Sequence, residues 1–125
     1  MLKAKKKEYL NEMKLRSVDI GVKNSLIMVD GEGNLGDLNE RKRIKAVDNH
    51  KKWVEAANYI GCNHIRVNAA GNGTEEDVSK YASDSLQKLG DFSKDFDINI
   101  IVENHGGYSS DAQWLVNVIQ KIVSD

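Results

Sequence analysis

Three short apolar runs, separated by long segments of helical periodicity, constrain the fold of this chain more than any other feature. The runs occupy residues 25–29, 63–68 and 98–102. Apolar side chains recur at helical spacing before, between and after them, at about residues 3–20, 39–60, 74–89 and 110–122. Parallel strands need crossover connections of a dozen or more residues, usually helices. The order α-β-α-β-α-β-α therefore predicts an α/β fold with a parallel sheet.

Residues with known preferences for helix ends support these boundaries. Gly61 is expected to end the long central helix, because glycine adopts the left-handed conformation of a helix terminus at little cost. Thr74 with Asp77, and Ser110 with Gln113, resemble capping boxes at the starts of the last two helices. In the first helix, Tyr9 is predicted on the apolar side together with Leu10 and Met13.

The second and third apolar runs each have one wholly apolar face and one face with polar groups. Side chains of a strand alternate between two faces. The apolar faces carry Ile65, Val67, Ile98, Ile100 and Val102, and the opposite faces carry His64, Arg66, Asn68, Asn99, Ile101, Glu103 and His105. A doubly wound sheet is covered by helices on both faces, whereas a (β/α)8 (TIM) barrel is covered on one and places its polar chemistry at the carboxyl ends of the strands.

The pattern thus predicts parallel βα units that form part of a TIM (β/α)8 barrel. No linker or low-complexity segment divides residues 1–125, so they are expected to form one partial barrel domain. A complete barrel takes about 250 residues. A chain of 125 residues with three strands is therefore expected to be a fragment, or to assemble with another copy.

Composition excludes several functional classes. The net charge of −1 gives no basic field for nucleic acid or anionic lipid. No run approaches the roughly 18 apolar residues of a membrane span, so no membrane partner is expected. Cys62 is the sole cysteine, which allows neither an internal disulfide nor a cysteine zinc site and fits a cytoplasmic location.

Glu103 is the first candidate for catalysis and for metal binding. It follows a buried strand, faces the polar side, and precedes the loop Asn104-His105-Gly106-Gly107. A carboxylate in this place could ligate a divalent cation or move a proton beside a polarised carbonyl. His105 has the same facing and could contact a substrate hydroxyl. The alternatives, a solvated glutamate and a surface loop histidine, remain open.

Asp30, Asn68 and Arg66 are the other candidates for substrate contact. Asp30 and Asn68 end the first two strands and would share a rim with Glu103 if the strands are adjacent, although both residue types also serve loop turns. Arg66 could bind a substrate phosphate or form a structural ion pair with Glu103. His50 is interpreted as a satisfied core histidine on the apolar face of its helix. His64, at the opposite end of its strand, is assigned no chemistry.

The glycine-rich loop after the first strand matches two motifs weakly. Gly31-x-Gly33-x-x-Gly36 has the spacing of a dinucleotide fingerprint, but Gly36 precedes the helix, and Asn68 stands where an acidic ribose ligand is expected. The spacing of Asp30, Glu32 and Asn34 resembles a calcium loop, which fails at the turn glycine and at its twelfth position.

Residues 26–115 resemble the sugar phosphate isomerase/epimerase family, whose domain is a xylose isomerase-like TIM barrel. The resemblance lies in the segments 27–33, 53–57, 61–68 and 101–107, which correspond to about the third to fifth strands of the family barrel. It implies an isomerase or epimerase that binds a divalent metal ion (Mn, Mg, Co or Zn) and acts on a sugar or sugar phosphate. Glu103 matches the fifth-strand glutamate that is both metal ligand and acid/base.

The same resemblance implies an incomplete active site. The family's remaining ligands come from strands six to eight, which this sequence lacks, so the chain alone is expected to be inactive and to hold a metal weakly or not at all. It would then need a missing C-terminal half. An alternative is a non-catalytic assembly module or subunit that self-associates through its open sheet. A minor alternative rests on Glu103-Asn104, which resembles a metal-binding pair of endonuclease IV, a phosphodiesterase with the same barrel.

Overall fold

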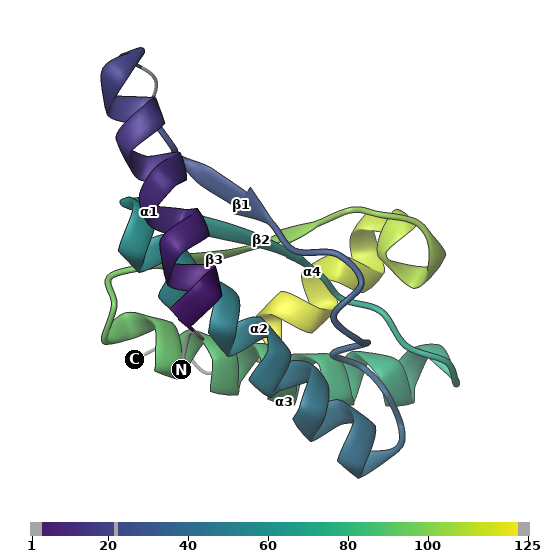
Figure 1. Ribbon diagram of the computed structural model, residues 1–125. Coiled ribbons are helices and arrows are strands. Elements are labelled where there is room, and N and C mark those ends of the chain that lie inside the picture. Colours follow the sequence, from purple (N-terminus) through teal and green to yellow (C-terminus); the bar gives the residue numbers. More distant parts are fainter. Residues whose placement is uncertain (1–3, 22, 123–125) are drawn as a thin grey trace.

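The structure, a computed structural model, describes residues 4–21 and 23–122. The predicted start of the first helix at residue 3 lies outside these residues. Helices and strands alternate along the chain, as the sequence predicted, with one additional short 3-10 helix, η1 (Figure 1). The elements are α1 (Ala4–Asp19), β1 (Leu26–Met28), α2 (Glu40–Ile60), β2 (His64–Asn68), α3 (Glu75–Lys94), β3 (Asn99–Glu103), η1 (Gly107–Ser110) and α4 (Ala112–Gln120).

The helix ends follow the local chemistry of the sequence with one exception. Gly61 ends α2 in the left-handed conformation, with φ of 82°. The side chain of Thr74 accepts a hydrogen bond of 3.1 Å from the backbone N–H of Asp77, which confirms the predicted cap of α3. The predicted cap at Ser110 is wrong. Ser110 belongs to η1, and Asp111 caps α4 because its carboxylate accepts from two backbone N–H groups of the first turn.

The three strands form a parallel sheet in the order β1-β2-β3, which confirms the predicted class. Ile65 lies between Ile27 and Ile100 in the register, and Arg66 lies between Met28 and Ile101. β1 is shorter than predicted, and β3 begins and ends one residue later. Because the register is fixed, residues of like facing in the three strands form rows across the sheet.

Among the described residues, helices cover only one face of this sheet. Figure 1 shows α2 and α3 side by side beneath the strands. Ile65 and Val67 point to this side and are fully buried, and each contributes roughly 1.5–3 kcal/mol by leaving water. On the opposite face Leu26, Met28 and Ile101 are 43%, 59% and 41% exposed. Within the described residues the sheet is thus a wall with helices behind it, as in part of a TIM barrel.

The first helix is less well covered than its sequence predicted. Leu10 is buried and Met13 packs against the core, but Tyr9 is 70% exposed, so its predicted place on the buried side is wrong. Val18 and Ile20, in and just beyond the last turn, are also exposed. No helix in the described part of the chain is long and apolar enough to cross a membrane.

Candidate active site at the carboxyl ends of the strands

Asp30, Asn68 and Glu103 form one row at the carboxyl end of the uncovered face. The register pairs Asn68 with Glu103. On its other side, Asn68 Nδ2 donates a hydrogen bond of 2.9 Å to Asp30 Oδ1. The sheet therefore brings together three polar residues that are separated by 38 and 35 positions in the sequence.

Arg66 lies one step below this row and links it. Its Nε is 2.9 Å from Glu103 Oε2, and its Nη2 is 3.9 Å from Asp30 Oδ2. The Arg66 side chain is only 20% exposed, so the ion pair with Glu103 is largely shielded from solvent. The sequence left two roles open for Arg66, phosphate binding and an ion pair with Glu103. The distances support the ion pair.

Two acceptor atoms of the row are buried without a hydrogen-bond partner in the described part of the chain. They are Asn68 Oδ1 and Glu103 Oε2. Arg66 Nε is close to Glu103 Oε2 but is not oriented for a hydrogen bond, and it is itself unpartnered. Buried polar atoms in native proteins are nearly always paired. The charge of Glu103 Oε2 is thus balanced by the Arg66 guanidinium without a hydrogen bond, and the Glu103 side chain as a whole is 32% exposed.

His105 lies beside the row but is more exposed. Its Nδ1 is 3.7 Å from Glu103 Oε2, and its side chain is 62% exposed. The backbone N–H of His105 donates a 3.0 Å hydrogen bond to Ser109 Oγ, which holds the loop against η1. No three Asp, Glu, His or Cys side chains converge as a metal site among residues 4–21 and 23–122. Glu103 and His105 thus offer part of a donor set, not a complete one.

Two residues near the row, Glu32 and His50, were not selected from the sequence as site residues. With Asn68 and His105 they line a cavity of about 140 Å³. Trp53 Nε1 donates a 3.1 Å hydrogen bond to Glu32 Oε1, which fixes the loop carboxylate to α2. The helical periodicity placed His50 on the buried side of α2, and it is 3% exposed. No local pattern in the sequence indicates that the adjacent loop leaves a cavity there.

The glycine-rich loop after β1 packs closely against the backbone of the loop after β2. The N–H of Gly36 donates a 2.7 Å hydrogen bond to the carbonyl of Ala70 in the loop after β2. A Cβ at Gly36 would lie 2.8 Å from the same oxygen, so a larger residue does not fit there. Helix α2 begins only at Glu40. The dinucleotide-like spacing is therefore explained by the contact between two loops, and its glycines do not open the helix as that fingerprint requires.

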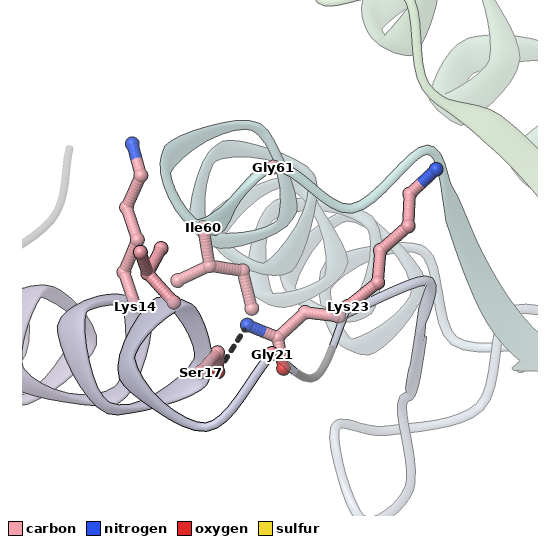
Figure 2. A pocket seen from close by; sticks show the side chains of 8 residues that line it. Lys14, Ser17, Gly21, Lys23, Ile60 and Gly61 are labelled. Carbon is pink, nitrogen blue, oxygen red and sulfur yellow. Dashed lines mark hydrogen bonds between the residues drawn. The ribbon is translucent and has the colours of Figure 1, made fainter.

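A second pocket, of about 290 Å³, lies at the opposite end of the sheet (Figure 2). Asn24 Nδ2 donates a 2.9 Å hydrogen bond to Ser17 Oγ across it. Lys14 and Lys23 lie on its two sides, and Figure 2 shows their ammonium groups pointing away from each other. The two lysines therefore do not converge on a common anion. His64 is at the same end of the sheet, far from the row of polar residues, as expected from its strand position.

Solved structures of sugar epimerases and related proteins share this fold at low sequence identity. A D-tagatose 3-epimerase-like protein superimposes with a TM-score of 0.81 and 17% identity, over 94% of this chain and 47% of its own length. A xylose isomerase domain protein from Planctomyces limnophilus gives 0.74 and 19%, over 94% and 46%. The D-psicose 3-epimerase of Clostridium cellulolyticum, solved with D-tagatose, gives 0.74 and 12%, over 92% and 44%.

The chain spans about half the length of these structures. Comparison with curated proteins found no match. The family model described as xylose isomerase-like TIM barrel matches residues 2–125, almost the whole sequence. The chain therefore belongs to the xylose isomerase-like TIM barrel family, of which it supplies part of the barrel.

Proposed function

We propose that this chain supplies part of the active site of a sugar isomerase or epimerase, in which Glu103 moves a proton on the carbon next to a carbonyl. The observation that carries the proposal is the position of Glu103 Oε2. It lies at the carboxyl end of β3 on the face without helices, beside Asn68 and 2.9 Å from Arg66 Nε. TIM-barrel enzymes place their catalytic groups at this end of the strands.

The neighbouring residues have roles that follow from their contacts. Asn68 and Asp30 are hydrogen-bonded to each other at the rim, where they would bind substrate hydroxyl groups. Arg66 holds the Glu103 carboxylate in place through the 2.9 Å ion pair, and its charge could also meet an anionic group of the substrate. His105 is exposed enough to approach a substrate from the loop.

A divalent metal ion, Mn, Mg, Co or Zn, belongs to this proposal as a partner of Glu103. When bound, such an ion polarises a carbonyl as a Lewis acid. The described residues do not make a complete site for it, because no three suitable side chains converge. Glu103 would contribute one ligand and His105 at most a second, with the others provided by the remainder of the barrel. The chain alone is therefore proposed to be inactive.

The substrate is proposed to be a small sugar or sugar phosphate, handled in the cytoplasm. Several of the similar structures are epimerases of free ketoses by name, which supports the class without identifying the sugar. A nucleic-acid substrate is disfavoured, because the rim combines two carboxylates, Asp30 and Glu103, with one guanidinium from Arg66.

The proposal is tested by hydrogen exchange in a complete barrel that contains this chain. In D2O with Mn²⁺ and a ketohexose, the hydrogen on the carbon beside the carbonyl should be lost from the proton NMR spectrum. Glu103→Gln keeps the shape of the side chain but removes the base, and it should abolish the exchange. Glu8→Gln, the same change at an exposed position of α1, serves as the matched control. Exchange that persists in Glu103→Gln contradicts the proposal.

Self-association is a second candidate, favoured by the uncovered face. Leu26, Met28 and Ile101 expose apolar surface there, and β1 and β3 are edge strands of the described sheet. Exposed apolar surface and unpaired strand edges promote association. Sedimentation velocity at micromolar concentration should show a dimer or larger species, and Met28→Lys should shift it toward monomer. A well-folded wild-type monomer at this concentration excludes the assembly role.

A further inference from the structure

The cavity beside the polar row contains a buried histidine with one unused nitrogen. His50 is 3% exposed and lines the cavity of about 140 Å³. Its Nδ1 lies 2.6 Å from the carbonyl oxygen of Ala46, one turn earlier in α2. A carbonyl can only accept a hydrogen bond, so Nδ1 must carry a proton.

The other ring nitrogen, Nε2, is therefore an acceptor in the neutral ring. Burial lowers the pKa of His50 below its ordinary value, which favours the neutral form near pH 7. Nε2 has no hydrogen-bond partner among the described residues. This nitrogen can therefore accept a hydrogen bond from a donor in the cavity that His50 lines.

Two further side chains that line the cavity, Asn68 and Glu32, carry acceptors, while Asn34 and His105 on the same lining can donate. Asn68 Oδ1 is buried and unpartnered in the described part of the chain, because the amide nitrogen of Asn68 is the atom that bonds to Asp30. Glu32 is held by Trp53 through Oε1, which leaves its second oxygen for another partner. Three side chains that carry acceptors, from α2, β2 and the loop after β1, thus line one small space.

We propose that His50, Asn68 and Glu32 form a subsite for the uncharged, hydroxyl-bearing arm of a polyol. Hydroxyl groups donate to all three acceptors. A phosphate or carboxylate group brings no donor and would be repelled by the Glu32 carboxylate. The subsite rests on the proposed function only in taking this arm to be part of a sugar. It extends that function by proposing that the non-phosphorylated end of the substrate enters this cavity.

The size of the cavity agrees with such a ligand. A cavity of roughly 150 Å³ can hold a molecule of about six heavy atoms, and a three-carbon polyol has that size. The cavity opens beside His105, next to the row that contains Glu103, so an arm bound there would belong to a substrate that reaches the row. Ordered water could also bond to the acceptors, and the experiment therefore tests a polyol directly.

The test is a titration of the 125-residue chain with glycerol and, separately, with glycerol 3-phosphate. Histidine side-chain ¹H–¹⁵N NMR reports Nε2 of His50 and of His64, the latter at the other end of β2. Glycerol should shift His50 Nε2 saturably and leave His64 unchanged. Glycerol 3-phosphate should bind at least several-fold more weakly. A His50 signal that does not move, or tighter binding of the phosphate, overturns the inference.

Two substitutions separate the roles of the two ring nitrogens. His50→Asn keeps a donor near the Nδ1 position for Ala46 but lacks the second nitrogen, and it should weaken glycerol binding about tenfold. His50→Gln extends to the Nε2 position and should weaken binding less. His64→Asn is the matched control and should not change it. Unaltered affinity in a folded His50→Asn protein overturns the inference, and the wild-type Nε2 shift decides the matter if that variant does not fold.

The outcome is independent of the test of the proposed function. Saturable glycerol binding at His50 without ketose exchange in the completed barrel would retain the polyol site and remove the isomerase proposal. Exchange that depends on Glu103, with no response at His50, would do the reverse.

Discussion

The substitution Gly71→Ala should destabilise the fold, because two loops of the site cross at Gly71 with almost no space between them. A Cβ at Gly71 would lie 2.4 Å from the carbonyl oxygen of Gly36 and 2.7 Å from its carbonyl carbon. An ordinary carbon–oxygen contact is about 3.3–3.6 Å. The loops would have to separate by roughly 1 Å, which would strain or break the 2.7 Å hydrogen bond from Gly36 to Ala70.

The magnitude follows from two contributions. Overpacking of this kind costs about 1–3 kcal/mol, and loss of one backbone hydrogen bond about 1 kcal/mol, so the free energy of unfolding should fall by about 2–4 kcal/mol. For a chain of this size that lowers the Tm by roughly 10 °C. Because Asp30 and Asn68 flank these loops, the Asn68–Asp30 hydrogen bond should also weaken.

Gly90→Ala is the matched control for this prediction. Gly90 lies inside α3, and a Cβ there would meet nothing within 4 Å. Alanine favours helix more than glycine by about 1 kcal/mol, so this variant should be slightly more stable than wild type. Urea and thermal unfolding followed by circular dichroism measure both changes. A Gly71→Ala protein as stable as wild type would refute the loop crossing.

Three further predictions concern the titratable groups. Burial raises the pKa of the Cys62 thiol, so a thiol reagent at pH 7.5 should label it only as the protein unfolds, and rapid labelling of the native state would contradict its burial. Since the fold lowers the pKa of His50, the unfolded state binds a proton at this residue more readily than the folded state as the pH falls. The contribution of neutral His50 to the free energy of unfolding is therefore present above about pH 6.5 and is lost below it. In urea titrations at pH 5 and 7.5, His50→Asn should reduce this difference in stability. A double-mutant cycle with Arg66→Met and Glu103→Gln should give a coupling free energy of about 1–2 kcal/mol, because the pair is largely shielded; a value near zero would mean that the 2.9 Å ion pair does not persist in solution.

The sequence predicted the sheet and the row of polar residues because both depend on local periodicity. Alternation along β2 and β3 placed Arg66, Asn68 and Glu103 on one face, and the βα repeats implied parallel neighbours, so their proximity followed from strand geometry. Local sequence patterns misplaced the N-terminal cap of α4 by one residue. Ser110 and Asp111 are both good caps, and the choice between them depends on η1, which packs against α4.

The cavity could not be predicted, because it depends on contacts between distant residues. Glu32 is fixed by Trp53, 21 positions later, and no local pattern shows that the two meet. His50 was interpreted as a satisfied core residue, and one nitrogen is indeed satisfied by Ala46. The state of the other depends on how the glycine-rich loop passes over α2. Tyr9 is a similar case. Helical periodicity placed it on the apolar side of α1, but no described part of the chain covers its side chain.

The central claim is that Glu103, which is 32% exposed, can bind a cation at the rim of the uncovered face beside its ion pair with Arg66, and Mn²⁺ tests it most directly. Added to the ¹⁵N-labelled chain, Mn²⁺ should bind weakly and broaden the amide signals of residues 103–105 and 68–69, which surround Glu103. Glu103→Gln should remove this broadening. Broadening by Mn²⁺ at the acidic first turn of α3, Glu75-Glu76-Asp77, should remain in this variant and serves as an internal control. Broadening around residues 103–105 that is unchanged in Glu103→Gln, or absent from the wild-type chain, would contradict the account.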